Sequence, residues 1–276
     1  MQRRLTSSLG TLGATQVRFL YGLPFAILFL ALVLLLERQG LPGWNITFVY
    51  FVTSAAVVQI AATALMLAAM QLRSFAVTTV YVKTEPVQVA LFAWLMLGDP
   101  LSIWSLATVM LATLGVIVMS WRQGAEQSTP WRAVTLGLAS GACFALSSVA
   151  FRGAILSLDG ASFLLRASTT LVSGLVLQTL LLVLYMGWRQ RPALFSSLRA
   201  WRESLLAGFM GALASQCWFI GFALTSAVNV RTLGLVEVLF AQLVSRRVFG
   251  EHSSGRERLG MALVMSGVVL LLWQQA

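Results

Sequence analysis

Nine apolar segments, each about as long as a membrane-spanning helix, account for most of this chain. A helix needs about 20 consecutive apolar residues to cross a hydrocarbon layer about 30 Å thick. The longest connection between segments, residues 187–203, is too short to form a soluble domain. We therefore expect an all-α, multi-pass membrane protein whose function lies within the bilayer. The segments cover residues 12–36, 47–70, 76–98, 101–121, 131–157, 161–187, 203–223, 227–249 and 256–274.

Composition agrees with this interpretation and excludes several classes of function. Hydrophobic residues make up 58% of the chain and charged residues 10%, whereas soluble domains are roughly 45–50% apolar. The net charge of +10 comes from arginines in short loops, which membrane topology explains better than a nucleic-acid partner. Cys143, Cys217 and His252 are isolated from one another, so we expect no metal, no other cofactor and no enzymatic activity.

The arginines outside the segments are distributed unevenly between the two sides of the membrane. Thirteen fall on the side of Met1, and only Arg38 and Arg152 fall on the opposite side. Cytoplasmic loops carry an excess of lysine and arginine. The charge count therefore predicts a cytoplasmic Met1 in a protein of the cell's inner membrane.

The chain contains an internal repeat with an offset of 152 residues. Five segments separate Arg18 from its twin Arg166, and an odd number reverses the direction through the membrane, which predicts inverted-topology repeats. We predict two halves, residues 1–122 with four helices and residues 131–276 with five. The segment at residues 131–157 has no twin, and its partner would lie upstream of Met1, which suggests either a mis-assigned start or a genuine nine-helix variant. The matching pairs include Gly98/Gly250, Gly115/Gly267, Trp121/Trp273 and Glu85/Glu237.

These features together resemble the EamA-type transporters of the drug/metabolite transporter superfamily. The likeness rests on an arginine at the start of the second helix of each half, a Glu-Pro pair in the fourth helix (Glu85 and Pro86), and a Gly-acid turn after it. Two departures are the absent first helix and Val238 in place of the second proline. The resemblance implies ten helices in two five-helix halves and export or exchange of small metabolites or drugs. It also implies both termini inside, contrary to the charge count.

Four charged residues lie inside the apolar segments: Lys83, Glu85, Arg231 and Glu237. A charge near the bilayer centre costs at least about 2.5 kcal/mol, so such residues usually face a cavity or a partner. Counted along continuous helices, Glu85 and Glu237 both lie about 14 Å deep, near the midplane. Residues two apart project about 200° apart around a helix, so Lys83 should pair with a residue other than Glu85.

We expect these charges to surround a polar cavity that binds substrate or a proton, which Glu237 could carry. Gln88, Asn229 and Gln242 are predicted to touch this cavity. Trp218 is interpreted either as a pocket residue or as core. Arg18 and Arg166, nearer the segment ends, are interpreted as snorkelling or as clamping loops. The alternative for the four charges is a structural ion-pair network that locks helices together.

The predicted function is secondary transport of a small organic molecule by alternating access. The chain has no ATP-binding motif, so a gradient would drive the movement. The alternative is a non-transporting membrane scaffold or an inactive truncated transporter. A membrane enzyme acting on lipids is a weaker alternative, because no clustered nucleophile, base or metal set is present.

Overall fold

The computed structural model describes residues 13, 15–72, 78, 81–100, 102–120, 131–237, 239–240 and 255–273. All regular secondary structure in these residues is helical. Five of the helices are long and apolar enough to cross a membrane, and three further apolar helices in the described part are shorter. The prediction of an all-α, multi-pass membrane protein is confirmed.

The helices form two compact units. Unit 1 consists of Met1–Ala68 and Leu146–Thr225, and unit 2 of Ala69–Ala145 and Ser226–Ala276. Each unit combines residues from both predicted halves, so packing divides the chain differently from the repeat. The repeat boundaries at residues 1–122 and 131–276 stay a prediction.

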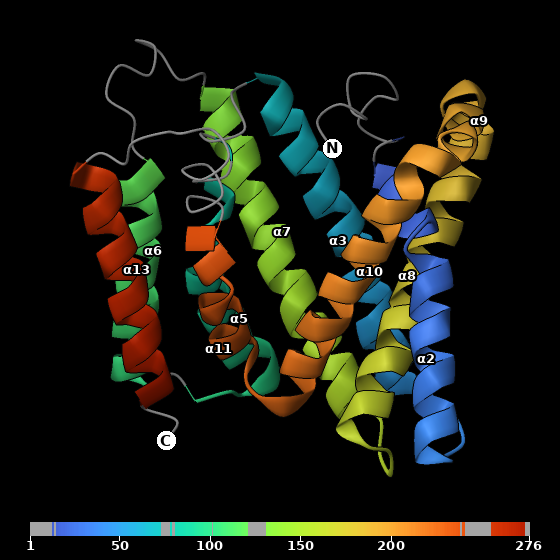
Figure 1. The fold of residues 1–276 in the computed structure, drawn as a ribbon, viewed down its shortest axis with the longest axis horizontal. Helices are drawn as coiled ribbons and strands as arrows, with labels where there is room; N and C mark the ends of the chain where they lie inside the picture. The colour runs from blue at the N-terminus through green and yellow to red at the C-terminus, as the bar shows by residue number, and fades with distance from the viewer. Residues whose placement is uncertain are drawn as a thin grey trace. The chain divides into compact units, whose positions relative to one another are not determined.

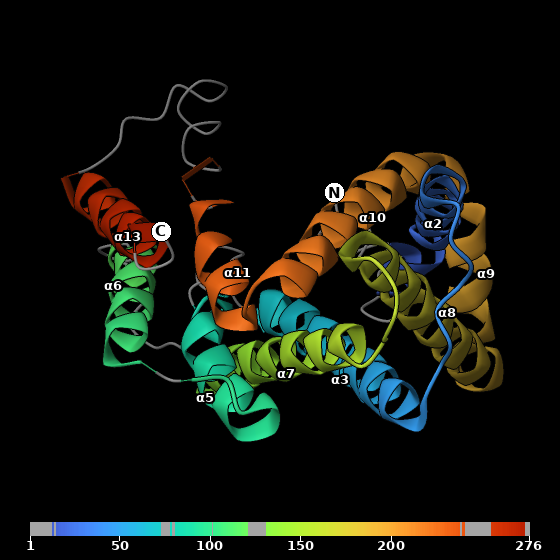
Figure 2. The ribbon, with the colours of Figure 1, turned by 90° about the horizontal axis from the view of Figure 1, so that it is seen from below.

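Unit 1 is built around α2 (Leu23–Glu37), α8 (Phe163–Arg189) and α10 (Trp201–Leu224), which contact one another. It also contains α3 (Ile46–Leu72) up to residue 68 and α7 (Trp131–Leu156) from residue 146. Figures 1 and 2 both show α2 beside α8.

A short helix, α9 (Arg191–Arg199), occupies the stretch that the sequence predicted to be a connection between two spans. It begins directly after α8 ends and contacts it. Pro192 is tolerated because it lies in the first turn, where a backbone N–H has no partner within the helix. The connection at residues 187–203 therefore contains a helix that the sequence analysis did not predict.

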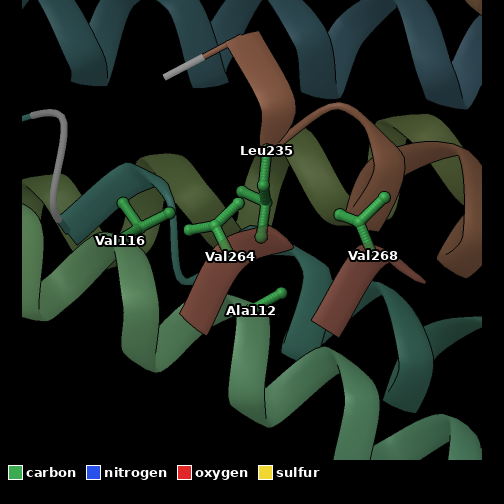
Figure 3. Packing of buried hydrophobic residues seen from close by; sticks show 5 residues of the cluster. All are labelled: Ala112, Val116, Leu235, Val264 and Val268. Carbon is green, nitrogen blue, oxygen red and sulfur yellow. The ribbon is translucent and has the colours of Figure 1, made fainter. Parts of the chain in front are cut away.

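Unit 2 contains α5 (Glu85–Leu97), α6 (Ile103–Ser120), α11 (Ala227–Leu233), α13 (Gly255–Trp273) and α7 up to residue 145. Figures 1 and 2 both show α6 beside α13 and α5 beside α11. Aliphatic side chains from α6, α13 and the turn after α11 form one buried cluster (Figure 3), with Leu235 1% exposed. The cluster is Ala112, Val116, Leu235, Val264 and Val268.

The contact between α6 and α13 is reciprocal under the 152-residue offset. A methyl group added at Gly115 would lie 2.6 Å from the backbone nitrogen of Val264. One added at Gly267 would lie 2.8 Å from the backbone nitrogen of Ala112. The 152-residue offset places Gly267 opposite Gly115 and Val264 opposite Ala112 in the alignment of the two halves. The contact made by one glycine is therefore the counterpart of the contact made by the other. A duplication of these two helices predicts reciprocal contacts of this kind, and the inverted repeat itself stays a prediction.

The two segments that carry Glu85 and Glu237 are interrupted, which corrects the prediction of continuous helices at residues 76–98 and 227–249. Lys83 and Thr84 form a turn, and α5 begins only at Glu85. Pro86 has no N–H to donate to the carbonyl four residues earlier, and its ring crowds that carbonyl. In the second half α11 ends at Leu233 and is followed by a turn at residues 234–235.

Candidate functional site

The four intramembrane charges form two ion pairs in unit 2. Lys83 pairs with Glu237 through Nζ and Oε1. The Nε atom of Arg231 lies 3.1 Å from Oε1 of Glu85. Each pair joins a cation from one predicted half to an anion from the other, and the expectation that Lys83 pairs with a residue other than Glu85 is confirmed.

The helix breaks determine where the two carboxylates lie. Glu85 is the first residue of α5, where unpaired backbone N–H groups and the helix dipole favour a negative charge. Glu237 follows the turn after α11, and its backbone N–H donates to the carbonyl of Gly234 at 3.1 Å. The depth of about 14 Å assumed continuous helices, so that estimate no longer holds for either residue.

The two pairs differ in exposure. In the Arg231–Glu85 pair the side chains are 17% and 9% exposed. In the Lys83–Glu237 pair Lys83 is 20% exposed, but Glu237 is 55% exposed. A buried pair that loses one partner leaves a costly unpaired charge, whereas an exposed pair contributes little to stability. The Arg231–Glu85 pair is therefore expected to contribute more to stability than the Lys83–Glu237 pair.

Polar side chains adjoin these pairs. Gln88 lies one turn after Glu85, on the same side of α5. Its Nε2 donates to Oγ1 of Thr84 at 3.2 Å, while its Oε1 is buried and accepts no hydrogen bond from the residues that the structure describes. Asn229 lies in α11, where its backbone N–H donates to the capping hydroxyl of Ser226 at 3.2 Å. Gln242 lies outside the described residues.

Two glycines of α7 allow the interrupted segment to lie close to that helix. A methyl group added at Gly137 would lie 2.6 Å from Cβ of Tyr81. One added at Gly141 would lie 3.2 Å from the carbonyl oxygen of Val82, the carbonyl to which Pro86 cannot donate. The Gly137/Gly141 spacing therefore serves close helix packing, here between α7 and the residues just before the break.

A small polar cavity lies within unit 1 and was not predicted from the sequence. It has a volume of about 20 Å³, enough for about one water molecule. Gln178 donates from Nε2 to Oε1 of Gln59 at 2.6 Å. The available signal was the presence of glutamines within two apolar segments. The polar residues that line the cavity are Arg18, Gln59, Gln178 and Ser215. Arg18, which the sequence analysis interpreted as snorkelling or as clamping a loop, therefore faces this cavity.

Trp218 belongs to α10 in unit 1, whereas both ion pairs belong to unit 2. Its ring centre lies 6.4 Å from that of Phe222. It is absent from the residues that line the unit 1 cavity. Trp218 therefore packs against another ring of α10, and its interpretation as a pocket residue stays a prediction.

In the described part of the chain, no three His, Cys, Asp or Glu side chains come together in a way that could hold a metal. Both carboxylates are already paired with cations. The described part of the site offers charges of both signs and the buried Oε1 of Gln88.

Comparison with known proteins supports a transport role for this fold. The model of the EamA-like transporter family matches residues 1–121 and 131–273. Solute carrier family 35 member E4 of Rattus norvegicus is 38% identical over 72 residues, which span 26% of this chain and 21% of that protein. The Homo sapiens protein of the same name is 35% identical over 103 residues, 37% of this chain and 29% of that protein. One protein crystal structure has the same fold, with a TM-score of 0.71 and 17% identity over 98% of this chain and 92% of that one.

Proposed function

The chain belongs to the EamA-like transporter family, and from this premise we propose that it moves a small polar organic solute by alternating access. The family and the solute-carrier relatives support membrane transport of small solutes. The observation that carries the proposal is a pair of interrupted helices with four charged residues in or next to the interruptions. Discontinuous helices are how many transporters form substrate and ion sites inside the membrane.

In this proposal the two ion pairs have different roles. The buried Arg231–Glu85 pair keeps α5 and α11 together throughout the cycle. The Lys83–Glu237 pair opens, because Glu237 is the more exposed carboxylate. A proton on Glu237 removes its charge and releases Lys83 to bind an anionic group of the solute. The buried Oε1 of Gln88 accepts a hydrogen bond from a solute donor.

We further propose that an ion gradient drives the cycle, with the proton as the coupling ion. The movement is export or exchange, as the family resemblance implies, and the proposed location is the cell's inner membrane. The arginine distribution of the loops supports a cytoplasmic Met1 within that membrane.

The test is the variant Glu237→Gln in reconstituted vesicles that contain a pH-sensitive dye. Adding a small-molecule metabolite extract to one side should change the internal pH with the wild-type protein and leave it unchanged with the variant. The amide retains hydrogen-bonding capacity but cannot carry a proton. Glu37→Gln is the matched control, because Glu37 binds Ser162 in unit 1 and is outside the site.

Three outcomes would contradict parts of the proposal. Full solute-dependent proton flux by Glu237→Gln at every pH would eliminate the coupling role. Poor folding of the variant without a specific transport defect would favour a structural ion-pair network. The absence of any solute-dependent flux in the wild type would favour the scaffold alternative.

A further inference from the structure

A basic and aromatic segment surrounds α9, outside the proposed transport site. Residues 188–202 contain four arginines, two tryptophans and no acidic residue, and Glu203 follows directly. Residues 188–203 therefore carry a net charge of +3. This is a dense positive charge for a stretch of chain between two apolar helices. The arginines are Arg189, Arg191, Arg199 and Arg202.

One side of helix α9 packs against the rest of unit 1. Ser197 is fully buried, and the hydroxyl of Tyr21 donates to the carbonyls of Ser197 and Leu198, at 2.9 Å in each case. Phe195 and Leu198 are 59% and 43% exposed. At 100° per residue these two side chains share a side of the helix, with Arg199 next to them. A short helix with an exposed apolar side and flanking arginines is typical of the membrane interface.

Aromatic rings hold two of the arginines at the helix ends. The guanidinium of Arg189 lies 4.4 Å from the ring centre of Trp188, and that of Arg202 lies 5.2 Å from the ring centre of Trp201. Tryptophan rings concentrate at the depth of the lipid headgroups. Their stacking therefore holds these cations at the level of lipid phosphates. Arg191 differs, because its Nε donates to the carbonyl of Gly187 at 2.9 Å and caps α8.

We propose that α9 and its flanking arginines form a binding site for anionic phospholipid headgroups. Arg189, Arg199 and Arg202 bind the phosphate through the planar, multi-donor geometry of the guanidinium group. Phe195 and Leu198 lie against the first carbons of the acyl chains. Basic groups next to a membrane helix attract anionic lipids in this manner.

The experiment compares binding of phosphatidylglycerol and phosphatidylcholine to the purified full chain by native mass spectrometry. The wild type should bind phosphatidylglycerol preferentially. The triple variant in which Arg189, Arg199 and Arg202 are all replaced by glutamine should bind phosphatidylglycerol at least about tenfold more weakly. Each basic residue near an anionic surface strengthens binding about fivefold. Phosphatidylcholine binding should not change. The matched control changes three exposed arginines elsewhere to glutamine: Arg132, Arg256 and Arg258.

Two results would overturn the proposal. The first is equal affinity of the wild type for the two lipids. The second is an equal loss of phosphatidylglycerol binding in the control, which would indicate an effect of net charge rather than of this site. If the triple variant does not insert, Arg199→Gln alone decides, because Arg199 is exposed. It should weaken phosphatidylglycerol binding severalfold, and an unchanged affinity would refute the site.

Discussion

The two ion pairs should contribute very differently to stability, although their carboxylates are equivalent in the repeat. Glu85→Gln leaves Arg231 buried without its partner, since the two side chains are 9% and 17% exposed. Breaking a buried pair costs about 3–5 kcal/mol, which is a factor of about 100 or more in the folding equilibrium. Glu237→Gln acts on a carboxylate that is 55% exposed and should cost about 1 kcal/mol or less.

The assay is equilibrium unfolding of both variants in mixed detergent micelles, followed by circular dichroism. The double variant Glu85→Leu with Arg231→Met supplies the control, because replacing both members of a buried pair with apolar residues is often neutral. It should recover most of the stability that Glu85→Gln loses. Equal losses for Glu85→Gln and Glu237→Gln, or no recovery in the double variant, would refute the assignment of a structural role to one pair and an opening role to the other.

Three further predictions concern packing. Gly267→Val should destabilise by about 1–3 kcal/mol through overpacking, because a methyl group there would lie 2.8 Å from the backbone of Ala112; Gly255→Ala, with open space around it, should change the unfolding midpoint little. Leu235→Ala should lower the free energy of unfolding by about 2–5 kcal/mol in the same assay. A decrease below about 1 kcal/mol would show that the buried cluster does not stabilise the turn after α11. Gln178→Leu should cost about 1–3 kcal/mol by removing the partner of a part-buried amide, and adding Gln59→Leu should recover part of the loss in a double-mutant cycle.

The general architecture could be predicted from the sequence because the bilayer imposes its constraint locally. Each span must satisfy its own backbone groups within one continuous stretch of apolar residues. The repeat stays a prediction, which rests on the matching residue spacing that a duplication preserves along the chain. Gly115 and Gly267 occur at the predicted offset and make reciprocal contacts between α6 and α13.

The helix breaks and α9 were missed for different reasons. A count of apolar residues does not register which backbone hydrogen bonds are lost, so Pro86 was interpreted as a family feature and not as the start of α5. The stretch at residues 191–199 is too short and too polar to count as a span. Its amphipathic character becomes apparent only when one side of α9 packs against the rest of unit 1.

The sequence alone determined that the intramembrane charges balance, and that Lys83 needs a partner from another segment. Only the tertiary structure decided which residues pair, because Lys83 and Glu237 are 154 positions apart. The same holds for Gln59 and Gln178, which are 119 positions apart and meet beside the unit 1 cavity. Which residues become partners depends on how each helix is rotated about its axis and on where it is interrupted. Packing between helices, and not the composition of a single helix, determines both.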